Sequence, residues 1–127
     1  VIETILMSML FGGEFKTMMP KLHSAHFEGM ELIRPLYYVR EKDIITWKNA
    51  YHLNFLNCAC KFTDLVEKEE KSSKRLVTKQ LIASLKEQNP FVENNIFKSV
   101  EKVNLNTLIS YHKGNQMTHF LDHYDDE

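Results

Sequence analysis

The first thirteen residues, VIETILMSMLFGG (residues 1–13), predict an amphipathic helix with a defined end. Apolar side chains recur at the i, i+3, i+4, i+7 and i+8 positions of one helix face, at Ile2, Ile5, Leu6, Met9 and Leu10. Gly12 and Gly13 then supply the backbone freedom that commonly ends a helix. No Ser, Thr, Asp or Asn precedes the helix as a cap. We therefore expect the chain to be the C-terminal part of a longer protein.

The residues after this helix are typical of an α/β layer. A short apolar segment that stops at Pro35 predicts a strand, because proline cannot donate to a strand ladder. A helical pattern and a second apolar segment follow. The expected elements are a loop or short helical piece over residues 14–26, a strand over 30–36, a helix over 41–52 and a strand over 53–56. This strand–helix–strand order predicts a parallel sheet.

The second half of the chain is predicted to be helical. Residues 64–75 are charged and Ser-rich, which indicates an exposed connection. Apolar spacing and capping residues then predict helices over 76–88, 90–100 and 104–112, followed by a frayed tail. The expected organisation is an α/β domain over residues 1–63, a linker over 64–75 and a helical region over 76–127.

Composition narrows the class of protein. The chain is 43% hydrophobic and 26% charged, as in ordinary globular domains, and no apolar run would span a bilayer. Its formal net charge of −1 excludes a uniformly basic nucleic-acid binder but allows a local basic face. Cys58 and Cys60 are too close in sequence for a useful structural disulfide. Reduced thiols in a cytoplasmic protein are the expectation.

The opening helix resembles the one that follows the His-x-x-Asp-Asp motif of PP-loop ATP pyrophosphatases. In that pattern Glu and Thr follow the aspartate pair, and Glu3 and Thr4 match them. Four further features, in this order, resemble the tRNA 2-thiocytidine synthetase (TtcA) group: Met-Pro-Lys at 19–21, Ile-Arg-Pro-Leu at 33–36, Val-Arg-Glu-Lys-Asp-Ile at 39–44 and the cysteine pair. The resemblance covers residues 1–64 and extends less clearly into the C-terminal region.

This resemblance implies a fold and an activity. The fold would be the C-terminal half of a Rossmann-like (adenine nucleotide alpha hydrolase-like) parallel sheet layer, followed by a helical arm. The parent enzyme would adenylate a tRNA cytidine with ATP and Mg²⁺ and then replace the carbonyl oxygen by sulfur. It would be a cytoplasmic homodimer, with tRNA and a sulfur donor such as a cysteine desulfurase as partners and no membrane. The Ser-Gly-Gly-x-Asp-Ser loop is absent from this sequence, so we expect the chain alone to be inactive.

The two cysteines are the candidate catalytic residues. Members of the group hold a [4Fe–4S] cluster through three cysteines, and Cys58 matches the ligating position nearest the C-terminus. Cys60 follows after one residue, where many members have two, so its role stays open. Thiolates are the natural ligands of such clusters. The alternative is that both cysteines are small buried hydrophobic residues beside a strand end.

Several charged residues are candidates for binding ATP or tRNA. The resemblance places Glu3 near the nucleotide, and the paired donors of Arg34 and Arg40 could hold a phosphate. The alternatives are a carboxylate that complements the helix dipole and an ion pair of Arg40 with its sequence neighbours Glu41 or Asp43. Candidates for tRNA binding, or for an ordinary solvated face, are Lys16, Lys21, Lys42, Lys74 and Arg75.

Two other functions fit parts of the sequence. One is another PP-loop tRNA-modifying ligase, such as a lysidine synthetase relative. The cysteine pair argues against it, because lysidine formation needs no sulfur. The other is a non-catalytic interaction module that carries this segment.

Overall fold

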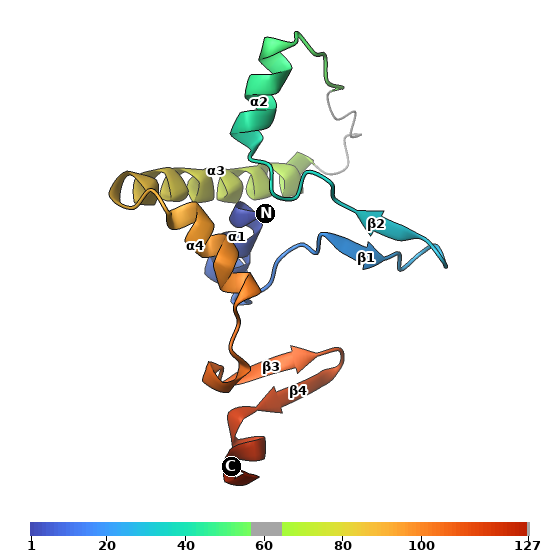
Figure 1. Ribbon diagram of the computed structural model, residues 1–127, viewed down its shortest axis with the longest axis vertical. Helices are drawn as coiled ribbons and strands as arrows, with labels where there is room; N and C mark the ends of the chain where they lie inside the picture. Colours follow the sequence, from blue (N-terminus) through green and yellow to red (C-terminus); the bar gives the residue numbers. More distant parts are fainter. Residues whose placement is uncertain (57–64, 127) are drawn as a thin grey trace.

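The computed structural model describes residues 1–56 and 65–126 as an α/β chain of helices and two small antiparallel hairpins (Figure 1). In chain order the elements are α1 (Ile2–Gly12), β1 (Lys21–His23), β2 (Glu31–Ile33), α2 (Glu41–Ala50), α3 (Leu65–Gln88), α4 (Val92–Glu101), the 3₁₀ turn η2 (Leu105–Thr107), β3 (Ser110–Lys113), β4 (Gln116–His119) and η3 (Phe120–Asp126).

The helix predicted from the opening residues is confirmed as α1. It ends at Gly13, which adopts the left-handed conformation with φ 64° and ψ 23°. The backbone N–H groups of Gly13 and Glu14 both point back to the carbonyl of Ser8, the latter at 2.9 Å. This closure supplies the Ser8 carbonyl, near the end of the helix, with hydrogen-bond donors.

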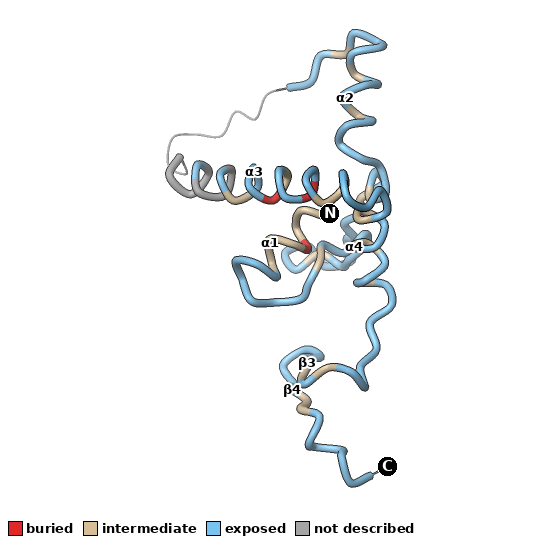
Figure 2. Tube along the Cα trace, turned by 90° about the vertical axis from the view of Figure 1, so that its left-hand side faces the viewer, coloured by how far each residue is buried: buried red, intermediate tan, exposed pale blue. Residues whose placement is uncertain are grey.

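The described core lies where α1, α3 and α4 meet. Ile5 of α1 is fully buried, and Ile82 and Thr78 of α3 are buried beside it. Figure 2 shows these buried positions on the facing sides of α1 and α3. The Thr78 hydroxyl donates to the Lys74 carbonyl at 2.8 Å, so its one buried polar group is satisfied within its own helix.

Each hairpin is a two-stranded antiparallel sheet that projects from the helices (Figure 1). In the first, Lys21 pairs with Ile33 and His23 with Glu31. In the second, a two-residue loop joins β3 to β4, and its first residue, Gly114, has φ 62°. Glycine at this position is typical of a tight hairpin turn with positive φ. Isolated two-stranded sheets are only marginally stable, so neither hairpin forms a core of its own.

The predicted strand over 30–36 is confirmed in shorter form as β2, but its partner differs from the prediction. It pairs with β1, which lies in the segment predicted to be loop or helix. Residues 53–56 form no strand. The described residues therefore contain no parallel strand pair, and the parallel sheet is not seen in them. The chain reverses between β1 and β2 within seven residues, and so short a connection produces antiparallel pairing.

Two predictions for the second half were wrong. From Leu65 onward the charged segment 64–75 is helical and continues into α3, so it is no irregular connection there. Mixed charges four residues apart support an exposed helix as well as they suit a linker. Residues 104–112 form η2 and β3 in place of a helix. The Asn104 side chain accepts from the Asn106 N–H at 3.1 Å and thus caps a single 3₁₀ turn.

The chain leaves much apolar surface uncovered. Its accessible surface is 11385 Å², whereas a compact monomer of this mass would expose about 7,000 Å². Large apolar side chains are exposed on both hairpins and on α2, among them Leu32, Trp47 and Met117. Within the described residues, no helix is both long enough and apolar enough to cross a membrane.

Candidate functional site

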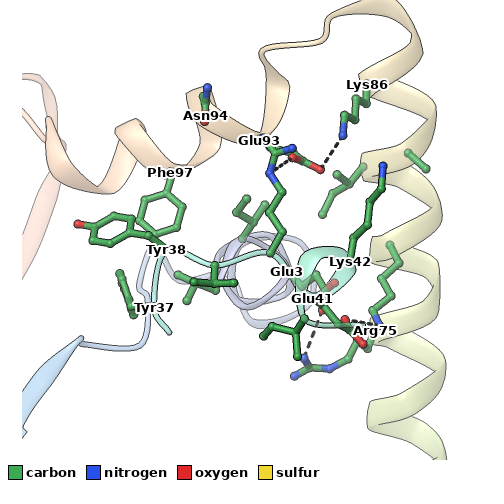
Figure 3. A pocket seen from close by; sticks show the side chains of 18 of the residues that line it. Glu3, Tyr37, Tyr38, Glu41, Lys42, Arg75, Lys86, Glu93, Asn94 and Phe97 are labelled. Carbon is green, nitrogen blue, oxygen red and sulfur yellow. Dashed lines mark hydrogen bonds and ion pairs between the residues drawn. The ribbon is translucent and has the colours of Figure 1, made fainter. Parts of the chain in front are cut away.

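A cavity of about 810 Å³ lies where four segments of the chain converge (Figure 3). Its walls come from the start of α1, the segment before α2 with the first turn of α2 (residues 37–45), one face of α3, and α4. Six cationic and four acidic side chains line it together with three aromatic rings. The cavity is within the size range of ligand sites in proteins.

Helical periodicity explains why α3 and α4 present their polar residues to the same space. Arg75, Lys79, Ile82 and Lys86 of α3 are spaced by four, three and four residues, which places them on one helix face. On α4 the lining residues Glu93, Phe97 and Glu101 follow the same rule, at intervals of four residues. Both helices therefore turn a charged face, interrupted by apolar residues, toward the cavity.

Ion pairs join α3 to the other walls. Arg75 Nη1 lies 3.3 Å from Glu3 Oε2, at the start of α1, and Lys79 Nζ lies 3.0 Å from Glu41 Oε2, at the start of α2. Both carboxylates lie in the first turn of their helices, where negative charge is favourable. The pairs are partly exposed, so each contributes little to stability and can be exchanged for another anion.

Glu93 of α4 is the most enclosed acid of the cavity. Its side chain is 18% exposed and lies between Arg40, with Nε 3.2 Å from Oε2, and Lys86, with Nζ 3.4 Å from Oε1. Oε2 is buried and has no hydrogen bond within the described residues, and the charge of the carboxylate is balanced by Arg40 beside Oε2 and by Lys86 beside Oε1. Glu93 thus ties the segment before α2 to both α3 and α4.

Three aromatic rings close the other side of the cavity. The ring centroids of Tyr37, Tyr38 and Phe97 lie 5.1 to 5.5 Å apart, with Tyr37 edge-on to both neighbours. The Tyr38 hydroxyl donates to Glu101 Oε1 at 3.2 Å. That hydrogen bond, together with the Glu101 charge, raises the pKa of Tyr38 above its ordinary value. Tyr38 therefore remains a neutral phenol at physiological pH, anchored at its tip.

The structure brings together four of the residues singled out from the sequence. Glu3, Arg40, Lys42 and Arg75 all line the cavity, although they come from three separate elements and the loop before α2. Arg40 is in an ion pair, as the alternative reading expected, but with a different partner. The neighbouring acids were the expected partners, and the observed one is Glu93.

The other basic candidates lie outside the cavity walls. The Arg34 guanidinium donates to the Met19 carbonyl and so fixes the chain beside the first hairpin. Cross-strand pairing occupies Lys21, whose Nζ is 2.9 Å from Glu31. The Lys74 ammonium lies 5.9 Å from the ring centre of Phe11.

Lys16 also lies outside the cavity. Its ammonium pairs with Glu14 at 2.6 Å and, by hydrogen bond and charge, lowers the pKa of that carboxyl. Cys58 and Cys60 lie outside the described residues. In the part of the chain that is described, no three His, Cys, Asp or Glu side chains are grouped so that they could hold a metal ion.

Sequence reasoning missed most of the cavity. The rings of Tyr37, Tyr38 and Phe97 and the acid Glu93 were not recognised as site residues. One usable signal was the spacing on α4, where Glu93 and Phe97 share a face with an acid four residues further on. No local signal shows that this face meets Tyr38, which lies 59 positions from Phe97 in the chain.

Charged and aromatic walls of this kind are typical of proteins that bind phosphorylated or nucleic-acid ligands. Comparison with known proteins identifies similar curated sequences. Curated proteins named tRNA-cytidine(32) 2-sulfurtransferase match the chain from Coxiella burnetii strain RSA 493 (33% identical over 87% of this chain and 41% of the relative) and from Geotalea uraniireducens (32% over 80% and 38%). The Legionella pneumophila protein is 33% identical over 81% of this chain and 34% of its own length.

The resemblance to the tRNA 2-thiocytidine synthetase group is confirmed. Between 80 and 87% of the residues of this chain align with curated tRNA-cytidine(32) 2-sulfurtransferases. The chain spans between 34 and 41% of the length of these curated relatives. No protein-family model matches the chain, and no solved structure matches it significantly.

Proposed function

We propose that this chain is the C-terminal part of an ATP-dependent tRNA-thiolating enzyme that makes 2-thiocytidine. The observation that carries the proposal is the similarity to tRNA-cytidine(32) 2-sulfurtransferases, at 33% identity over 87% of the chain. In this proposal residues 1–63 complete a Rossmann-like layer whose parallel strands lie elsewhere in the protein, and the C-terminal region packs beside it. The large exposed apolar surface supports this, because such surface marks sites of contact with further protein.

The proposed reaction has two stages. ATP, with Mg²⁺, would transfer its AMP group to the carbonyl oxygen of a tRNA cytidine and release pyrophosphate, and sulfur from a donor such as a cysteine desulfurase would then replace that oxygen as AMP leaves. The protein would act in the cytoplasm as a homodimer. Because the sequence contains no phosphate-cradling Ser-Gly-Gly-x-Asp-Ser loop, these residues on their own would not turn over ATP.

A [4Fe–4S] cluster, when bound, would hold the sulfur atom that is inserted into the cytidine. Thiolates suit such a cluster, but Cys58 and Cys60 are the only cysteines of the sequence, so a complete ligand set needs residues from outside it. Among the described residues no group of side chains offers a second place for a metal. The proposal therefore assigns cluster ligation to Cys58 and leaves Cys60 as its matched control.

The test is restoration of tRNA thiolation in cells. The native polypeptide that contains this chain is produced in a bacterium lacking its own tRNA-cytidine(32) sulfurtransferase, and the tRNA nucleosides are measured by mass spectrometry. We expect 2-thiocytidine to return, to be lost with Cys58→Ser and to persist with Cys60→Ser. Equal retention with both variants would contradict the role of Cys58. Absence of 2-thiocytidine from a soluble, folded protein would overturn the function.

A further inference from the structure

The cavity has two chemically different ends (Figure 3). Tyr37, Tyr38 and Phe97 gather at one end, while Glu3, Glu41 and Arg75 lie at the other. Glu93 of α4 and Lys86 of α3 meet apart from both ends. A ligand that fills this space must offer a flat apolar group to the rings and negative charge to the cations.

The aromatic end is built as a stacking surface. Tyr38 is 72% exposed, yet its ring is held 5.1 Å from Phe97 at a tilt of 33° and its hydroxyl is fixed by Glu101. A large exposed ring that is anchored at both its face and its tip loses little freedom when a second flat group stacks on it. Unstacked nucleic-acid bases are recognised in this way, because every base has a π face.

The cationic wall is long. Arg75, Lys79 and Lys86 occupy one face of α3, and the separation of eleven positions between Arg75 and Lys86 corresponds to about 16 Å of helix. That length exceeds the phosphate chain of a single mononucleotide and suits the backbone of a polynucleotide. Two further lining cations, Lys42 and Lys98, have no ion pair with any described residue.

The acids of the cavity do not prevent a phosphate from binding. Lys79 and Glu41 are 39% and 62% exposed in their pair, and exposed ion pairs contribute at most about 1 kcal/mol. Arg75 contacts Glu3 through Nη1, which leaves other donors of its guanidinium for a second anion. Cations outnumber acids among the lining residues, so the cavity as a whole attracts a polyanion.

We propose that this cavity binds an unstacked nucleotide of a single-stranded RNA loop, with its base on Tyr38 and Phe97 and the adjoining backbone along Arg75, Lys79 and Lys86. The inference rests on the proposed function, because a tRNA substrate presents such loops. It goes further by assigning the contact to residues of α3, α4 and the segment before α2. A free mononucleotide is the competing ligand, and it would leave much of the α3 stripe unused.

The first test separates loop recognition from general RNA binding. Affinity of the protein is measured by fluorescence anisotropy for a stem-loop RNA and for a blunt duplex of the same stem, with ATP as competitor. We expect Tyr38→Ala to weaken binding of the stem-loop about tenfold, which is within the range lost per stacked base. Binding of the duplex should not change. Tyr38→Phe retains the ring and should bind within about twofold of the original protein.

The second test addresses the cationic wall. Lys79→Gln and Lys86→Gln should each reduce the slope of log affinity against log salt by about 0.7, the value for one contact with single-stranded RNA. Lys113→Gln on β3, outside the cavity, is the matched control and should leave the slope unchanged. Equal slopes for all three variants would overturn the proposal even if Tyr38→Ala failed to fold.

Three results would contradict the nucleotide site. One is unchanged stem-loop affinity in folded Tyr38→Ala; another is an equal loss for stem-loop and duplex. The third is full competition by ATP at matched nucleotide concentration, which would indicate a mononucleotide site. Thiolation in cells is measured separately. If 2-thiocytidine forms while Tyr38→Ala binds RNA normally, the cavity proposal fails and the function stands. If no 2-thiocytidine forms but loop binding depends on Tyr38, the function fails and the cavity proposal stands.

Discussion

The helical junction of α1, α3 and α4 and the hairpin of β3 and β4 contain similar residues but bury them differently. Ile5 in the junction is fully buried, whereas Ile109, which precedes β3, is 72% exposed. The junction holds buried side chains and the cavity, while the hairpin residues are half-buried at most. We therefore expect an apolar residue to stabilise this chain most where three elements meet, because a two-stranded hairpin offers few neighbours.

The largest expected effect comes from removing the shared apolar contact of the junction. Ile5→Ala should lower the free energy of unfolding by about 2 to 4 kcal/mol, because it leaves a cavity between α1 and α3. Ile109→Ala should change it by less than about 0.5 kcal/mol. Urea unfolding followed by circular dichroism at the helix band measures both. Similar changes in the free energy of unfolding for the two variants would contradict the proposed difference between the junction and the hairpin.

A second comparison uses two glycines that are both in the left-handed conformation. Gly13 ends α1 with φ 64°, and Gly114 turns the second hairpin with φ 62°. An added Cβ meets no atom within 4 Å at either position, so the cost of alanine is conformational, about 1 kcal/mol. Gly13→Ala should lower the stability of the helices. Gly114→Ala should leave helix unfolding unchanged and increase amide exchange only in β3 and β4. Helix destabilisation by Gly114→Ala would show that the two regions fold together.

The smallest effect concerns the ionisation of Tyr38 beside Glu101. Its pKa is raised in the folded protein above the ordinary value of 10.0, so the neutral phenol is the form that folding favours. This contribution to stability is present below pH 10 and is lost as the pH rises through the higher folded pKa. Absorbance titration of the tyrosines should show one late ionisation, which Tyr38→Phe removes and Glu101→Gln moves to lower pH. Glu87→Gln on α3 is the control and should leave it unchanged.

Predictions from local sequence patterns succeeded for elements with clear periodicity. The apolar stripe that includes Ile5 and the glycine stop at Gly13 correctly located α1, and helical spacing correctly located α2 and α4. The strand pairing could not be predicted this way, because an apolar run such as residues 30–36 does not identify its partner. The second hairpin did carry a signal, a Gly-Asn pair between two short polar-apolar segments, which was overlooked in favour of a helix cap at Asn104.

Prediction of the candidate site was limited in the same way, because local patterns identify residues but not their distant partners. Local charge and motif resemblance brought Glu3, Arg40, Lys42 and Arg75 to attention, and they share one cavity. The ion pair of Arg40 was expected within its own segment and forms instead with Glu93, which is 53 positions away. Side-chain partners at that separation depend on how helices pack, which a single sequence does not encode in any local pattern.

The sequence by itself determined the places of α1, α2 and α4, the glycine end of α1, and the motifs that carry the similarity to tRNA sulfurtransferases. These depend on residues a few positions apart, where one turn of helix or one glycine decides the outcome. Only the tertiary structure decided that Tyr38 faces Phe97 and that Glu93 holds Arg40 and Lys86. Such contacts join residues distant in the chain, and burial between packed helices selects them among many alternatives of similar local energy.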